Sequence, residues 1–178
     1  LDRGVAIVAA AGNEGLGQLS YPARYDGVIA VGAVDAGGQF VSFSNQGEGM
    51  DFAAPGYGLY AAWSGDQLVE FSGTSASTPF VSGALAAVIS ETGVTTGREA
   101  ADILSRYGDD AGATGVDPQF GSGILNMRRV MQRNNPDIRD LAVSGHFLNL
   151  SQASGAGIPL QITVQNQGTT QTPATVMN

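Results

Sequence analysis

Two uninterrupted apolar stretches, residues 4–11 and 27–34, constrain the fold more than any other feature of this chain. Neither stretch alternates apolar with polar residues, as a strand with one solvated face does. Strands buried in a parallel sheet have such runs, because helices cover both faces of the sheet. Shorter candidate strands, separated by Gly, Asn or Pro, follow at residues 40–44, 51–54, 59–62 and 67–71.

Helical patterns come after these strands. Residues 75 to about 91 combine small residues with bulky apolar ones, which predicts a central, buried helix. Residues 96–99, Thr-Gly-Arg-Glu, have the spacing of a capping box and predict the start of a second helix, and residues 126–132 predict a short third one. Because parallel strands precede helices, residues 1–133 belong to the α/β class, with a parallel sheet flanked by helices.

Composition limits the classes of function. Of the 178 residues 43% are hydrophobic and 13% charged, which is enough apolar material for a packed core. The net charge is −8 and all eight basic residues are Arg, so no basic stripe is available for nucleic acid. No apolar stretch is long enough to cross a membrane. The chain has no cysteine, which excludes disulfides but not secretion. Without an initiator Met or a signal peptide, the sequence is expected to begin inside a fold.

The composition changes at residues 134–136, Asn-Asn-Pro, which indicates a linker. Beyond it we predict strands at residues 138–143, 146–150 and 158–165, the last with alternating apolar and polar residues. Three strands are too few for a closed sandwich. Residues 134–178 are therefore interpreted as a linker and a β-sandwich-like module that is cut off.

Ser75 lies where a glycine-containing turn runs into the central helix. The unpaired N–H groups of a first helical turn, with the positive end of the helix dipole, favour negative charge beside them. A serine there is placed for nucleophilic attack. Ser and Thr at a helix start are also typical N-caps, so the local pattern alone leaves both interpretations open.

Seven short motifs, in order, carry a resemblance to a known family. The chain resembles the C-terminal part of the catalytic domain of subtilisin-like serine proteases (subtilases), over about residues 1–133. The motifs are Ala10-Ala11-Gly12-Asn13-Glu14-Gly15, Tyr21-Pro22-Ala23, residues 28–34, Phe43-Ser44-Asn45, Ala53-Ala54-Pro55-Gly56, Gly73-Thr74-Ser75 and residues 120–126.

The resemblance implies a secreted bacterial endopeptidase that acts on peptide or protein substrates. Ser75 matches the family's nucleophile, while the Ser75 N–H and the Asn13 carboxamide match the two donors to the oxyanion. Substrate-binding residues would line opposite sides of the pocket for the residue before the scissile bond. They are Ala10, Ala11 and Gly12 on one side and Gly73 and Thr74 on the other.

The family's catalytic Asp and His precede the serine, and neither of their motifs is present here. The only histidine, His146, follows Ser75 and lies among predicted strands. Asp2 and Asp35 lack the flanking pattern of the catalytic acid. We therefore expect the chain alone to have at most trace activity, and we expect a missing N-terminal part with Asp and His as its partner. Phe80, where many relatives have histidine, is interpreted as a packing variation.

Two alternatives remain open. A sedolisin-like serine peptidase would share residues 73–79, but it has Asp where Asn13 stands. The chain could also be an inactive structural or interaction fragment.

Three expectations concern ligands and assembly. Residues 136–178 resemble the start of bacterial immunoglobulin-like or adhesion-related β-sandwich modules, chiefly through residues 162–168. No cofactor is expected; calcium is considered because Asp109, Asp110 and Asp117 cluster near glycines, but their spacing favours a solvated loop. Missing strands would leave a sheet edge exposed to self-association.

Overall fold

The computed structural model describes residues 4–91, 93–148, 150–152, 154 and 157–171. Its centre is a parallel sheet of β1 (Ile7–Ala10), β2 (Val28–Val34) and β3 (Met50–Pro55), in that order. β2 is buried along most of its length, as its unbroken apolar run predicts. The α/β class with a parallel sheet and flanking helices is confirmed.

The pairing of β2 with β3 contains a register shift between Ala30 and Val31. Asp51 compensates for it, because one carboxylate oxygen accepts the Ala30 N–H at 2.8 Å. Burial raises the pKa of Asp51, and this hydrogen bond opposes the rise. β1 pairs only with β2 among the described strands, so its other edge has no strand partner within them. Self-association through this edge stays a prediction.

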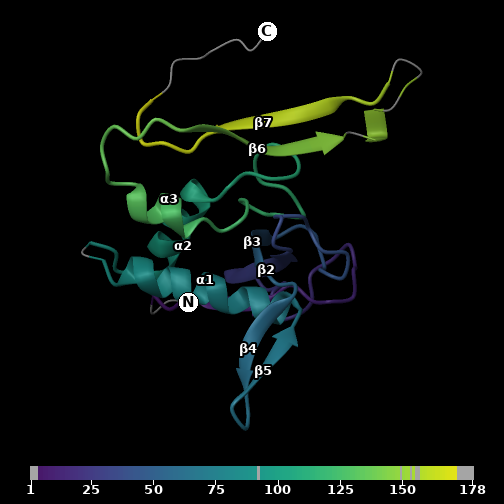
Figure 1. Cartoon of the computed structure of the whole chain (residues 1–178), viewed down its shortest axis with the longest axis vertical. Helices are drawn as coiled ribbons and strands as arrows, with labels where there is room; N and C mark the ends of the chain where they lie inside the picture. The colour runs from purple at the N-terminus through teal and green to yellow at the C-terminus, as the bar shows by residue number, and fades with distance from the viewer. Residues whose placement is uncertain (1–3, 92, 149, 153, 155–156, 172–178) are drawn as a thin grey trace.

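Helix α1 (Thr74–Ile89) lies against the sheet, as Figure 1 shows. One side of it is buried, whereas Phe80 and Ile89 are exposed, so the prediction of a central helix buried all round is only partly met in the described chain. α2 (Gly97–Tyr107) packs against α1, and α3 (Met127–Gln132) packs against α2. The main core contains Val31, Phe52, Val81, Leu85, Val88, Leu104 and Val130, all buried.

The predicted capping box of α2 is present, and α3 also has a capped start. At α2, Thr96 Oγ1 accepts the Glu99 N–H at 3.2 Å and the Glu99 carboxylate accepts the Thr96 N–H at 3.0 Å, which completes the capping box. At α3, the Asn126 side chain accepts the Arg129 N–H at 3.1 Å.

β4 (Leu59–Trp63) and β5 (Gln67–Phe71) form an antiparallel hairpin that projects from the body directly before α1 (Figure 1). The strand predicted at residues 40–44 is wrong. Phe40 makes a single bridge to Val34, and the chain then turns, with the Ser44 N–H donating to the Val41 carbonyl at 3.0 Å.

The C-terminal segment contains β6 (Leu141–Leu148), the 3₁₀ turn η1 (Leu150–Gln152) and β7 (Leu160–Asn166). β6 and β7 form a second antiparallel hairpin, on the opposite side of the body from β4–β5 (Figure 1). The two strands predicted at 138–143 and 146–150 are in fact one, because the ladder continues through a register shift between Val143 and Gly145.

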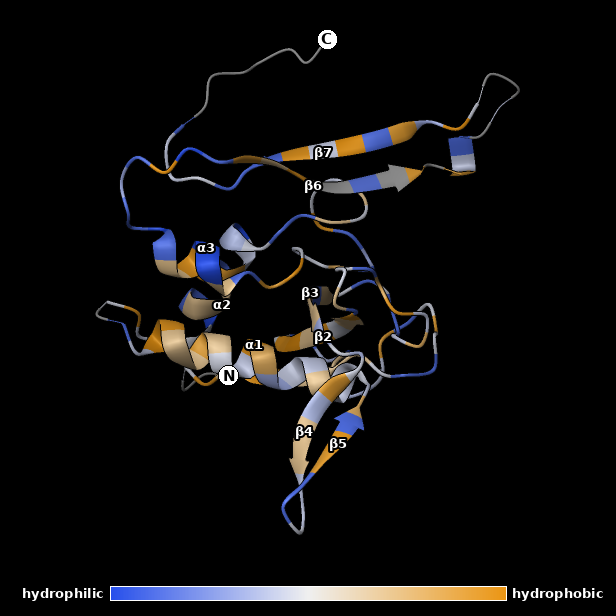
Figure 2. Ribbon diagram, viewed as in Figure 1, coloured by the Kyte–Doolittle hydropathy of each residue, from blue (hydrophilic) through white to orange (hydrophobic). Residues whose placement is uncertain are grey.

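β7 alternates apolar and polar residues, which Figure 2 shows as orange and blue bands. Its polar residues face the body: Thr163 is buried beside Thr114, with 3.1 Å between their hydroxyl oxygens, and Gln165 donates to the Gly108 carbonyl at 3.0 Å. Leu160 and Ile162 are more than half exposed. The hairpin is therefore held through its polar face.

Arg129 on α3 joins the body to this hairpin. Its buried guanidinium donates to the Gly108 carbonyl at 2.6 Å and to the Asn166 carbonyl at 3.2 Å, and it pairs with Asp109 at 3.3 Å. The boundary at 133/134 and the immunoglobulin-like nature of the tail stay predictions. None of the described helices has both the length and the apolar character needed to cross a membrane.

Candidate active site

Two loops meet at the carboxyl ends of the parallel strands. The first, residues 11–16, follows β1 and contains Asn13; the second leads from the β4–β5 hairpin into α1. Asn13 Oδ1 accepts the Thr74 N–H at 2.8 Å and the Thr74 hydroxyl at 3.0 Å. Open α/β sheets form ligand crevices at this end. The structure thus places Asn13 directly beside the residue that precedes Ser75.

Thr74 connects the two loops a second time. Its hydroxyl oxygen accepts the Gly12 N–H at 3.2 Å while its hydrogen goes to Asn13 Oδ1. Because both hydrogen bonds to Asn13 end on Oδ1, the carboxamide turns its oxygen toward Thr74. Asn13 Nδ2 makes no hydrogen bond within the described part of the chain, and the Asn13 side chain is exposed.

Ser75 is the second residue of α1 and is exposed. In this first turn the Thr74 N–H donates to Asn13 and the Ala76 N–H donates to the Gly73 carbonyl. The Ser75 N–H makes no hydrogen bond to the described residues. It is therefore a free donor next to the serine hydroxyl, at the positive end of a 16-residue helix.

Glycine is needed at position 73. Its φ of 154° is one that residues with a side chain rarely adopt, and a Cβ there would lie 3.4 Å from Asn13 Nδ2. The Gly73 N–H donates to the Gly56 carbonyl at 2.8 Å, so this turn is also fastened to the end of β3. The serine consequently has a fixed position relative to the sheet.

The predicted substrate-binding residues lie along the same two loops. Gly12, Gly73 and Thr74 gather around Asn13. Ala10 ends β1 opposite Val31, and Ala11 is completely buried, with its N–H donating to the Val31 carbonyl at 2.9 Å.

Asn45 is a residue whose importance the sequence did not reveal. In the sequence it stands only within a three-residue motif, yet its buried side chain hydrogen-bonds Ala11, Glu14 and Leu16 of the loop around Asn13. Its partners lie 25 to 34 residues away in the chain, and no local pattern signals such contacts.

The remaining candidate acids and bases lie elsewhere. His146 is exposed on β6, and Asp35 closes a tight turn by accepting the N–H groups of Gly37 and Gln39 at 2.8 and 2.9 Å. Asp2 lies outside the described residues. Phe80 is exposed on α1.

The three acidic residues considered for calcium have separate roles. Asp109 accepts from Asn126 and Arg129, Asp110 accepts the Gly115 N–H, and Asp117 accepts the Gln119 N–H. Within the described ranges no group of three or more His, Cys, Asp or Glu side chains is placed to hold a metal ion.

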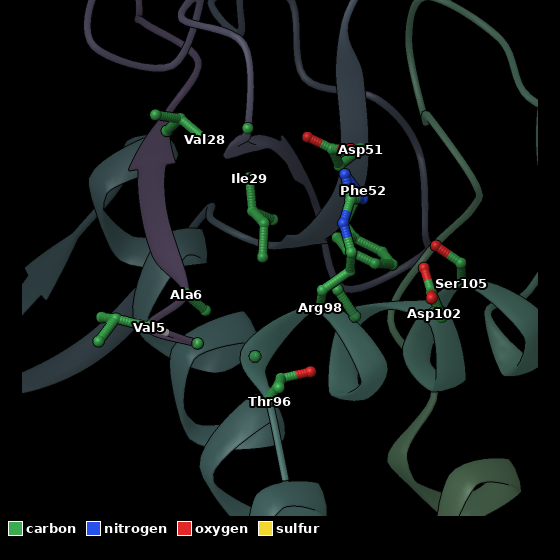
Figure 3. Close-up of a pocket in the computed structure, with 14 residues that line it drawn as sticks. Val5, Ala6, Val28, Ile29, Asp51, Phe52, Thr96, Arg98, Asp102 and Ser105 are labelled. Carbon is green, nitrogen blue, oxygen red and sulfur yellow. The ribbon is translucent and has the colours of Figure 1, made fainter. Parts of the chain in front are cut away.

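A pocket of about 530 Å³ lies at the other end of the sheet (Figure 3). Its walls come from the segment before β1, the starts of β2 and β3, and α2, with Asp51, Arg98 and Asp102 among the lining residues. Ligand crevices of parallel sheets lie at the carboxyl ends of the strands, and this pocket lies at the amino ends. We therefore place the candidate site at the Asn13–Ser75 loops.

A parallel α/β sheet whose carboxyl ends present a serine at a helix start, with a carboxamide beside it, defines a candidate acyl-transfer hydrolase. The model of the subtilase family matches residues 1–123. The chain belongs to the subtilase family, whose members are serine proteases.

Curated relatives with protease names are similar to this chain. Subtilisin Savinase of Lederbergia lenta is 39% identical over 124 residues, covering 70% of this chain and 45% of its own length. An alkaline protease of Alkalihalobacillus alcalophilus is likewise 39% identical over 124 residues, covering 70% of this chain and 32% of its own length. The chain thus spans less than half the length of these curated relatives.

Solved structures are similar over the same part. The prenylagaramide maturation protease PagA superposes with a TM-score of 0.64 at 30% identity, covering 72% of this chain and 50% of that one. A lanthipeptide protease has a TM-score of 0.69 at 22% identity, covering 74% and 51%, which supports the fold alone.

Proposed function

We propose that the protein is a serine endopeptidase of the subtilisin type, with Ser75 as nucleophile and with the Ser75 N–H and Asn13 Nδ2 as donors to the oxyanion. The observation that supports this most is the pair of hydrogen bonds from Thr74 to Asn13 Oδ1, which leaves Nδ2 without a hydrogen bond to the described residues and available as a donor. Donors fixed before the reaction stabilise developing charge at no reorganisation cost.

In the proposed reaction, Ser75 Oγ bonds to the scissile carbonyl carbon as a base removes the hydroxyl proton. The carbonyl oxygen becomes an oxyanion and accepts from Asn13 Nδ2 and the Ser75 N–H. The intermediate then expels the amine, which takes the proton from the base, and water hydrolyses the acyl-enzyme by the same route.

This chain contains no suitable base. Its only histidine is exposed on β6, in a hairpin that follows the catalytic fold. We propose that the Asp and the His come from polypeptide outside these residues, as the partial coverage of the relatives suggests. The chain alone then has at most trace activity.

Substrate recognition is proposed to use the two loops. Ala10 and Gly12 would form one wall for the residue before the scissile bond and Gly73 and Thr74 the other, because both segments border Asn13, whereas the complete burial of Ala11 argues against its predicted contact with substrate. The absence of a cofactor, secretion and the β-sandwich nature of the tail stay predictions. The sedolisin alternative is disfavoured because residue 13 is Asn.

Complementation tests the proposal against the inert-fragment alternative. We would mix the chain with the separately produced N-terminal part of a subtilase that contains Asp and His, and measure hydrolysis of a peptide anilide. We expect activity that disappears in Ser75→Ala. Asn13→Ala should lower kcat by roughly 100- to 1,000-fold, the range measured in a subtilisin. Hydrolysis that is absent, or unchanged in Ser75→Ala, would contradict the proposal.

A further inference from the structure

Asn45 holds the loop around Asn13 through hydrogen bonds to both polar atoms of its carboxamide, Oδ1 and Nδ2. Asn45 Oδ1 accepts the N–H groups of Glu14 and Leu16 at 3.1 and 2.8 Å. Asn45 Nδ2 lies within hydrogen-bond distance of the Ala11 carbonyl at 3.2 Å, the Glu14 carboxylate at 2.8 Å and the Ser20 hydroxyl at 3.1 Å. The residue is 0% exposed, so water replaces none of these partners.

Main-chain contacts reinforce this side chain. The Asn45 N–H donates to the Gly12 carbonyl at 3.0 Å, and the Gly15 N–H donates to the Phe43 carbonyl at 2.7 Å. A Cβ on Gly12 would lie 2.2 Å from Asn45 Nδ2, so the carboxamide occupies the space where a side chain of residue 12 would be. The loop is fastened on both sides of Asn13.

The loop needs such support because its own sequence does not make it rigid. The loop contains Gly12 and Gly15, one on each side of Asn13, with φ angles of 112° and 64°. Glycine has many accessible conformations in the unfolded chain. Asn13 itself is exposed, and its side chain contacts only Thr74 by hydrogen bonds to described residues. Within its own segment the Asn13 N–H donates to the Glu14 carboxylate at 3.0 Å, and that carboxylate in turn accepts from Asn45 Nδ2 at 2.8 Å.

We propose that Asn45 is a positioning residue, which sets the direction of the Asn13 carboxamide by holding residues 11–16. Its role in catalysis rests on the function proposed above; its role in holding the loop does not. Asn45 is buried behind the loop and does not touch the substrate. Its loss should therefore act through kcat and leave KM nearly unchanged.

The first test uses the chain as it is and needs no activity. Amide hydrogen exchange of Thr74 reports on its bond to Asn13 Oδ1, which Asn45 does not touch. In Asn45→Ala the loop loses four side-chain contacts and Ser20 loses a fifth, and we expect the Thr74 amide to exchange at least about tenfold faster relative to the core amide of Leu104.

Ser44→Ala is the matched control. Ser44 is the buried neighbour of Asn45; its hydroxyl accepts the Ala33 N–H at 3.1 Å and donates to the Asn45 main-chain carbonyl at 3.2 Å, with no hydrogen bond to residues 11–16 or to the Asn45 carboxamide. It should destabilise the protein without a selective effect on Thr74. Equal Thr74 exchange in the wild type and Asn45→Ala, or equal acceleration in both variants, would overturn the proposal.

A second variant covers the case in which Asn45→Ala does not fold. Asn45→Asp keeps the oxygen that accepts from Glu14 and Leu16 but loses the donors to the Ala11 carbonyl, the Glu14 carboxylate and the Ser20 hydroxyl, and it sets a second carboxylate against Glu14. We expect a selective acceleration at Thr74, and its absence would count against the proposal.

The complemented enzyme provides the kinetic test. Asn45→Ala should lower kcat by about 10- to 100-fold with KM within about twofold, as a misplacement of about 1 Å does. Combined with Asn13→Ala it should cause no further loss, because both changes remove the same donor. Independent, multiplying losses would overturn the positioning role. Selective Thr74 exchange without any complemented activity would reject the proposed function and keep Asn45 as the residue that orients Asn13.

Discussion

Replacing Ser77 by alanine should stabilise the protein. Ser77 lies on α1 two residues after the candidate nucleophile, is 0% exposed, and its hydroxyl has no hydrogen-bond partner among the described residues. An unsatisfied buried hydroxyl costs about 1–3 kcal/mol. Alanine also has a higher helix propensity than serine, by about 0.5 kcal/mol. The loss of packing around one small atom offsets part of this, and we expect a net gain of about 1 kcal/mol.

Urea denaturation followed by far-UV circular dichroism measures this gain, which corresponds to roughly 2–4 °C in Tm for a chain of this size. Ser82→Ala is the control, because the Ser82 hydroxyl lies on the same helix but is exposed and donates to the Thr78 carbonyl at 3.1 Å. It should change stability by less than about 0.5 kcal/mol. A clear loss of stability in Ser77→Ala would refute the reasoning.

A double substitution at Gly56 and Ser77 tests how tightly the Ser77 hydroxyl is packed. A Cβ on Gly56 would lie 2.2 Å from Ser77 Oγ, 2.7 Å from the Ala33 Cβ and 2.9 Å from the Gly73 carbonyl oxygen. Gly56→Ala alone should cost about 1–3 kcal/mol through overpacking. With Ser77→Ala present, the closest clash is gone, so the cost should fall below the sum of the two separate effects.

Three further outcomes are expected. Thr96→Ala should lower the free energy of unfolding by about 1 kcal/mol in urea, because α2 loses its N-cap acceptor. Arg129→Met should leave the Asn166 carbonyl without its donor, so β7 amides should exchange faster than those of the sheet. Burial raises the pKa of Asp51, so its carboxyl group binds a proton more tightly in the folded protein than in the unfolded chain. The free energy of unfolding should therefore fall as the pH rises from the ordinary carboxyl pKa through the pKa of Asp51 in the folded protein. Asp51→Asn retains an acceptor for the Ala30 N–H. Its free energy of unfolding should equal that of the wild type below this pH range and exceed it above, which urea denaturation at several pH values will measure.

The sequence predicted the elements that local patterns determine. The apolar run at residues 27–34 has no alternation and is β2, buried between helices and loops. The capping box at Thr96 marked the first residues of α2 correctly, because both of its partners lie within four residues. The motif order also indicated which two loops would lie together at Asn13 and Thr74.

Other features depend on contacts that no local pattern encodes. Residues 40–44 have the composition of a strand, but the chain turns there and brings Asn45 to the loop after β1. In the tail, separate strands were predicted at residues 138–143 and 146–150, whereas a register shift between Val143 and Gly145 lets β6 continue. The position of Asn45 depends on partners as distant as Ala11, and only the three-dimensional structure brings them together.

The hydrogen bond between Asn13 and Thr74 joins residues that are 61 positions apart. Between them the chain must build two strands of the central sheet and a complete hairpin before the two loops can touch. A nascent or partly unfolded molecule therefore exposes its serine without the neighbouring amide. Under the proposed function, this dependence would delay peptide cleavage until the polypeptide has reached its final shape.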